Sequence, residues 1–95
     1  MYNCDESEIK GNLVTYSSTG IYIEESDYCE LLDNVIENNG CGMLVAFSKN
    51  VVIANNFVVN NNYEGIATDT GDYALIKDNY CAYNQYGVFA LLATD

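Results

Sequence analysis

The chain has 95 residues, enough for one small domain, and 49% of them are hydrophobic, which suffices for a packed core. Its 14 acidic residues are opposed by three lysines, with no arginine and no histidine, so the formal net charge is −11. This balance argues against nucleic-acid binding, which needs a basic surface, and against adhesion to an anionic membrane.

The first ten residues, MYNCDESEIK, contain neither the basic region nor the apolar region of a signal peptide. No later run is long and apolar enough to span a membrane. We therefore expect no signal peptide within this chain. The compartment stays open, with a secreted or cell-surface parent as the expectation.

The rest of the chain is an internal repeat. Glycines open successive copies at spacings of 22, 23 and 22 residues, and a degraded copy precedes the first clear one. A fixed period of this size is typical of solenoid proteins. The opening glycines are Gly20, Gly42, Gly65 and Gly87. The copies cover residues 1–19 (partial), 20–41, 42–64, 65–86 and 87–95 (partial).

Polar and apolar positions recur in register within each copy. An asparagine follows each opening glycine after fourteen residues, and a second polar position comes five residues later. The positions one, eleven and sixteen residues after the glycine are apolar. The first polar column consists of Asn12, Asn34, Asn56 and Asn79. The second consists of Ser17, Asn39, Asn61 and Asn84.

Apolar residues alternate with more polar ones, as at Ile21, Ile23, Leu31 and Ile36, which indicates short strands with one buried face. Three strands per copy are expected, separated by turns rich in Asn, Gly and Ser. One copy cannot bury its apolar face, but copies stacked at the ~4.8 Å spacing of paired strands can. The sequence predicts a single all-β domain over residues 1–95. We expect a right-handed parallel β-helix of about four 22-residue turns, with an asparagine ladder at one corner.

Each ladder asparagine is expected to lie in a sharp turn in the left-handed region, which asparagine tolerates best after glycine. Its amide can satisfy backbone groups at the turn and its own copies above and below. The one extra residue of the period, assigned to Glu64, falls before Gly65 at a corner, where solenoids absorb insertions.

The pattern GIxI…I.xN.I..NN resembles the repeats of right-handed parallel β-helices in the pectate-lyase-like superfamily, from about Ile9 to Ala93. Leucine-rich repeats have a similar period, but no copy supplies LxxLxLxxN, and left-handed helices built on hexapeptides do not fit a 22-residue turn. Enzymes of the superfamily use an arginine or lysine base, or aspartates with a histidine. Arginine and histidine are missing here, and no lysine lies in such a cluster. We therefore expect no catalysis within this segment.

The four cysteines, Cys4, Cys29, Cys41 and Cys81, occupy four different columns, so stacking brings no pair together. The chain has no CxxC motif and no histidine to complete a zinc site. We expect the cysteines to be small buried hydrophobic residues.

A pectate-lyase-like enzyme would hold calcium with carboxylates on one face. Glu24 and Asp69 share a column, but Ala46 lies between them. Two turns are ~9–10 Å apart, whereas calcium needs oxygens at ~2.3–2.6 Å. Asp69 and Asp72, on the turn TDTGDY, could form a weak local calcium site, and the alternative is a solvated acidic face. No other cofactor is expected.

Tyrosine is over-represented, with nine residues and no tryptophan. Tyr63 and Tyr86 share the position before the opening glycine once Glu64 is set aside, and Tyr83 shares another column with Tyr16. A tyrosine has a flat apolar face and a polar tip, which suits stacking on a sugar. The alternative is that these turn residues stack on one another for stability.

The sequence thus predicts a non-catalytic β-helix segment, structural or carbohydrate-binding, of a larger secreted or cell-surface protein. A polysaccharide or glycan is the expected partner. One alternative is a fragment of a polysaccharide lyase, hydrolase or epimerase whose catalytic turns lie elsewhere. Another is a self-assembling coil, because bare ends would expose unpaired strand edges to adjoining turns or to a second copy.

Overall fold

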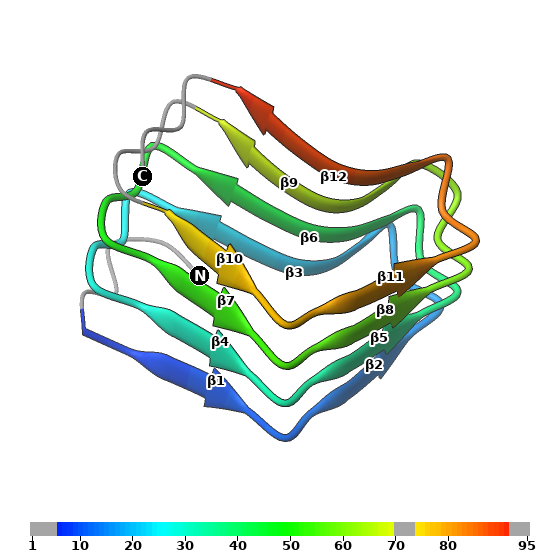
Figure 1. Cartoon of the computed structure of the whole chain (residues 1–95), viewed down its shortest axis with the longest axis horizontal. Helices are drawn as coiled ribbons and strands as arrows, with labels where there is room; N and C mark the ends of the chain where they lie inside the picture. The colour runs from blue at the N-terminus through cyan, green and yellow to red at the C-terminus, as the bar shows by residue number, and fades with distance from the viewer. Residues whose placement is uncertain (1–5, 70–73, 92–95) are drawn as a thin grey trace.

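The computed structural model describes residues 6–69 and 74–91, which form short strands wound into a coil (Figure 1). This part of the chain contains no helix that could cross a membrane. The strands are β1 (Glu8–Lys10), β2 (Leu13–Thr15), β3 (Thr19–Glu24), β4 (Glu30–Leu32), β5 (Val35–Glu37), β6 (Cys41–Ala46), β7 (Val52–Ala54), β8 (Phe57–Val59), β9 (Glu64–Asp69), β10 (Leu75–Lys77), β11 (Tyr80–Ala82) and β12 (Tyr86–Leu91).

Each strand pairs in parallel with the strand three places away in the chain, which gives three sheets of four strands among the described residues. The first sheet has the order β1-β4-β7-β10, the second β2-β5-β8-β11 and the third β3-β6-β9-β12. Three consecutive strands make one rung, and the rungs run from β1–β3, the lowest, to β10–β12, the highest (Figure 1). The path is right-handed, as parallel crossovers nearly always are. The predicted right-handed parallel β-helix is confirmed.

Apolar columns run along the coil axis and fill the interior. Leu31 and Ile53 pair in the first sheet, Ile36 and Val58 in the second, and all four side chains are fully buried. Each rung covers the apolar face of its neighbour, so the hydrophobic stabilisation comes from stacking and not from any single rung.

Three of the opening glycines, Gly20, Gly42 and Gly65, lie directly against the backbone of the next rung. A Cβ added to Gly42 would collide with the carbonyl oxygen of Gly65 on the next rung and lie 2.8 Å from Cγ1 of Val58. The backbone at this column is therefore packed too tightly for any side chain, which is the physical reason for its glycines.

Asparagine ladders occupy two corners of the coil, one between the first and second sheets and one between the second and third. In the first ladder, the N–H and Nδ2 of Asn34 donate to Oδ1 of Asn56 at 2.9 and 3.0 Å. Nδ2 of Asn56 also donates to the carbonyl of Leu31 on the rung below, at 3.0 Å. In the second ladder, the N–H of Asn39 donates to Oδ1 of Asn61 at 3.0 Å. These side-chain amides provide hydrogen-bond partners for backbone groups at the corners, where strand pairing stops.

The left-handed residue of each corner is not the ladder asparagine, as the sequence suggested, but the residue before it. At the first ladder these residues, with φ from 56° to 71°, are Gly11, Asp33, Asn55 and Asp78. At the second ladder, with φ from 56° to 61°, they are Tyr16, Asn38, Asn60 and Tyr83. The left-handed residue makes the bend, and the bend turns the following asparagine toward the interior, where its amide bridges two rungs.

The extra residue of the third rung falls at Tyr63 and Glu64, just before Gly65: the N–H of Tyr63 donates to Gly40 on the rung below as the N–H of Cys41 donates to Ser18, whereas Glu64 is the residue that pairs with Tyr86 on the rung above. Glu64 pairs with Tyr86 across β9 and β12, at the position where Thr19 pairs with Cys41 across β3 and β6. Tyr63 is left in the loop before β9, so it is not the register partner of Tyr86.

Candidate functional site

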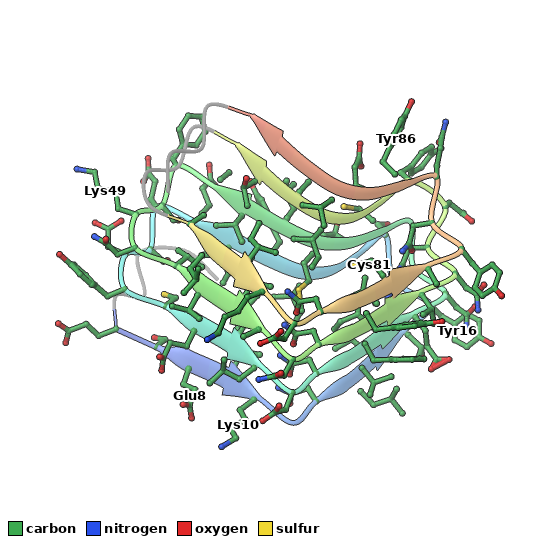
Figure 2. The ribbon with its side chains drawn as sticks, viewed as in Figure 1. Glu8, Lys10, Tyr16, Lys49, Cys81 and Tyr86 are labelled. Atoms are coloured by element: carbon green, nitrogen blue, oxygen red, sulfur yellow. The ribbon has the colours of Figure 1, made fainter. Side chains whose placement is uncertain are left out.

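Three of the tyrosines singled out in the sequence lie at one corner of the coil, between the second and third sheets on the two highest rungs. Tyr63 precedes β9, Tyr83 follows β11 and Tyr86 opens β12. Their exposed fractions are 59%, 81% and 51%. The backbone N–H of Tyr86 donates to the carbonyl of Tyr63 at 3.2 Å, which fixes the two loops against each other. We call Tyr63, Tyr83 and Tyr86 the tyrosine cluster; Figure 2 shows Tyr86 projecting away from the coil.

Tyr83 occupies an unfavourable backbone conformation. Its φ is 58°, in a column where Asn38 and Asn60 have the same left-handed geometry. That geometry costs an ordinary L-residue roughly 1–2 kcal/mol, and asparagine less. Tyr83 gains no compensating burial, since it is among the most exposed residues described. Strain kept at an exposed aromatic side chain is a reason to suspect a function for it.

Polar groups flank the cluster on the same loops. Asn62 and Gln85 are exposed, and Glu64 is half-buried. Together with the phenol groups, they offer amide donors and acceptors and a carboxylate next to flat apolar rings. Such a mixture suits a polyhydroxylated ligand better than a purely apolar one.

Cys41 lies on the rung below Glu64, close enough for its thiol to interact with the Glu64 carboxylate, and is only half-buried, so the expectation of a fully buried thiol fails there. Burial, followed by the charge of Glu64, raises the thiol pKa from 9.0 to about 11.

We expect alkylation of Cys41, measured by peptide mass spectrometry, to be slow at pH 8. Its rate should rise about tenfold per pH unit until near pH 11. Because the folded-state pKa is the higher one, the thiol favours the folded chain below pH 9 and loses this effect as the pH rises to about 11.

Glu64→Gln should shift this alkylation profile to lower pH, and Glu8→Gln, on the lowest rung of the first sheet, should leave it unchanged. A profile that Glu64→Gln does not move would show that burial alone sets the pKa of Cys41.

The sequence analysis missed an aromatic pair on the outer face of the second sheet. Phe57 and Tyr80 stack with ring centroids 5.1 Å apart and planes 7° from parallel. They continue a file that begins with Leu13 and Val35. The two rings turn one face toward each other along the file, so this pair supports the coil and does not present both faces to a ligand. Its signal was available, because these four residues share one column of the repeat.

The predicted local calcium site lies outside the described residues, because Asp72 and the side chain of Asp69 are not among them. The register confirms that Ala46 separates Glu24 from Asp69. No group of three or more His, Cys, Asp or Glu side chains that could hold a metal occurs in residues 6–69 and 74–91.

The described cysteines occupy different columns of the coil. Cys29 is buried with its Sγ 3.7 Å from the carbonyl of Asp27, and Cys81 continues an inner column of the second sheet with Val58. Cys29 fits the expected role of a small buried hydrophobic residue, whereas Cys81, like Cys41, is only half-buried although it packs against the core. Cys4 lies outside the described part of the chain.

Residues 1–94 match the family described as periplasmic copper-binding protein (NosD). No curated protein and no solved structure gives a significant match to the chain. The matched range includes all four rungs of the coil, so the similarity concerns the whole repeat and not one motif. This chain therefore belongs to the NosD family, a family of parallel β-helices.

Proposed function

We propose that this segment is a rigid, non-catalytic surface that binds a neutral polysaccharide through the tyrosine cluster. The observation that supports this most is Tyr83, which is exposed and strained beside two further exposed tyrosines. An exposed tyrosine in a left-handed backbone conformation contributes little to stability, so we attribute its role to a ligand that its ring contacts. The proposal includes the resemblance to pectate-lyase-like proteins: we propose that this chain shares with them both the type of repeat and a carbohydrate ligand.

Charge selects among carbohydrates. The chain carries a net charge of −11, so an acidic polysaccharide would be repelled at low ionic strength. The exposed amides of Asn62 and Gln85 can donate to and accept from hydroxyl groups of a neutral sugar while the tyrosine rings cover its apolar face.

The copper in the family's description does not fit the described residues. Protein copper sites are built from thiolate, thioether or imidazole groups that converge on one point. The chain has no histidine, and Met43 is fully buried in the core. Cys29, Cys41 and Cys81 lie in three different columns of the coil. We therefore assign no copper chemistry to this segment.

A pair of substitutions at residue 83 tests the carbohydrate proposal. We expect Tyr83→Ala to weaken binding of a neutral polysaccharide by about tenfold, the equivalent of one lost ring contact of roughly 1.4 kcal/mol. Tyr83→Asn should weaken binding equally but raise the free energy of unfolding by about 1 kcal/mol, because asparagine accepts the left-handed backbone. Affinity electrophoresis and urea titration measure the two effects.

Tyr28→Ala is the matched control. Tyr28 has a φ of 60° and is 60% exposed, but it lies at a different corner of the coil. Binding should survive this substitution. Retention of binding in Tyr83→Ala, or a polysaccharide array on which the unmodified chain binds no neutral chain, would overturn the proposal.

A further inference from the structure

We propose that copies of this chain associate head to tail, with the highest rung of one coil pairing with the lowest rung of the next. The contact surfaces are the outer edges of β10, β11 and β12 on one copy and of β1, β2 and β3 on the other (Figure 1). Both edges consist of two three-residue strands and one six-residue strand, so they match in length.

Apolar columns reach the surface at the highest rung in the second and third sheets and at the lowest rung in the second sheet, whereas Ile21, at the lowest rung of the third sheet, is only 7% exposed. In the third sheet, Met43 and Ile66 are fully buried, whereas Val88 on the highest rung is 51% exposed. In the second sheet, Val14 on the lowest rung and Cys81 on the highest are only partly buried. Stacking a second copy in register would cover Cys81 with Val14 and Val88 with Ile21, as each rung within the coil covers its neighbour.

The first asparagine ladder has a direction, and the direction makes the two ends complementary. Asn12 donates from its N–H and Nδ2 to Oδ1 of Asn34 at 3.0 and 3.1 Å, and Asn56 does the same to Asn79 at 2.9 and 2.8 Å. Among the described residues, the N–H of Asn79 has no such oxygen above it, and Oδ1 of Asn12 has no donor below it. A second copy placed head to tail would join these two groups in the geometry already present between neighbouring rungs.

The same polarity disfavours a symmetric pairing of like ends that places Asn79 opposite its own copy. Two highest rungs facing each other would oppose the unsatisfied N–H of Asn79 to its own copy, donor against donor. Head-to-tail contact is heterologous, and a heterologous contact that does not close into a ring grows as an open filament. The expected product is therefore a series of oligomers and not a closed dimer.

Electrostatic repulsion opposes this association. Each copy carries a net charge of −11, and continuing the file of the first sheet would place Lys77 beneath Lys10 of the next copy. Figure 2 shows Lys10 at the lowest rung of the coil. Salt shortens the range of both repulsions, from about 10 Å at 0.1 M to about 3 Å at 1 M. Association should therefore strengthen with ionic strength, as expected for a contact driven by apolar burial and backbone pairing.

Sedimentation velocity on the 95-residue chain and two end-blocked variants tests the proposal. Val88→Lys blocks the highest rung and Val14→Lys blocks the lowest. Each variant alone should be monomeric at concentrations where the unmodified chain forms oligomers. An equal mixture of the two should give dimers and nothing larger, because only one open end of each kind remains. Phe47→Lys, at a 55% exposed site in a middle rung, adds the same charge and should assemble like the unmodified chain.

Two results would overturn the proposal. One is an unmodified chain that stays monomeric up to millimolar concentration in 1 M salt, which would show that the two ends of the coil do not pair. Dimers formed by either blocked variant alone would show that like ends pair. Circular dichroism confirms that the variants fold. Amide exchange of the unmodified chain gives a readout without variants, because the N–H of Asn79 should become protected as concentration rises. The N–H of Asn62, which already donates to the carbonyl of Asn39 within the coil, should not change.

Discussion

Gly42→Ala should lower the free energy of unfolding by about 3 kcal/mol, the upper part of the range for overpacked interiors. The added methyl group would meet the carbonyl oxygen of Gly65 and Cγ1 of Val58, and the carbonyl oxygen cannot move without separating two paired rungs. For a domain of this size, the loss corresponds to a fall of about 12–24 °C in melting temperature. Urea titration followed by circular dichroism measures it.

Gly87→Ala separates this steric effect from any general effect of replacing glycine in a strand. Gly87 occupies the same column on the highest rung, but the nearest atom to an added Cβ is Cβ of Cys81 at 4.0 Å. We expect its free energy of unfolding to change by no more than about 0.5 kcal/mol, because this is an ordinary contact. Equal losses in the two variants would show that the glycine column is set by backbone preference and not by the closeness of the rungs.

The fold could be predicted because the repeat reports the same interior several times. A position such as Ile36 is apolar in every copy since it faces one continuous core, so the columns reveal the strands and their stacking. The backbone bends were not predictable in the same way. The left-handed position of the first corner is filled by Gly11, Asp33 and Asn55, which share tolerance of that conformation and not a single side chain. The left-handed conformation was therefore assigned to the neighbouring ladder asparagine, which is the same residue in every copy.

The candidate site was predicted less securely than the fold. Its tyrosines were grouped by assuming that Tyr63 and Tyr86 share a column, and the register shows that Tyr86 pairs with Glu64 instead. The cluster exists because one extra residue places Tyr63 in the loop beside the strand that Tyr86 opens. Insertions shift loops by amounts that a repeat pattern does not encode, so neither this neighbourhood nor the half-buried position of Cys41 beside Glu64 could be derived from spacing.

Asn56→Ala should be the most damaging substitution in the first ladder, lowering the free energy of unfolding by about 4 kcal/mol. Oδ1 of Asn56 accepts from the N–H and Nδ2 of Asn34, and its Nδ2 donates to Leu31 and Asn79. Asn34 and Asn56 are 1% and 2% exposed, so the groups left without partners cannot turn to water. Each such buried group costs about 1–3 kcal/mol, and alanine also leaves a void.

The position of an asparagine along the ladder should decide its contribution, which gives this prediction its controls. Asn12→Ala removes the same side chain at the exposed end of the ladder, where it donates to Asn34 but accepts from no described residue. We expect it to cost about 1 kcal/mol, since water can replace the lost bond. Asn62→Ala, an exposed asparagine outside the ladder, should change the free energy of unfolding by less than about 0.5 kcal/mol. If denaturant titration gave Asn12→Ala and Asn56→Ala equal losses, the ladder would act through corner geometry alone and the buried amide bonds would contribute nothing of their own.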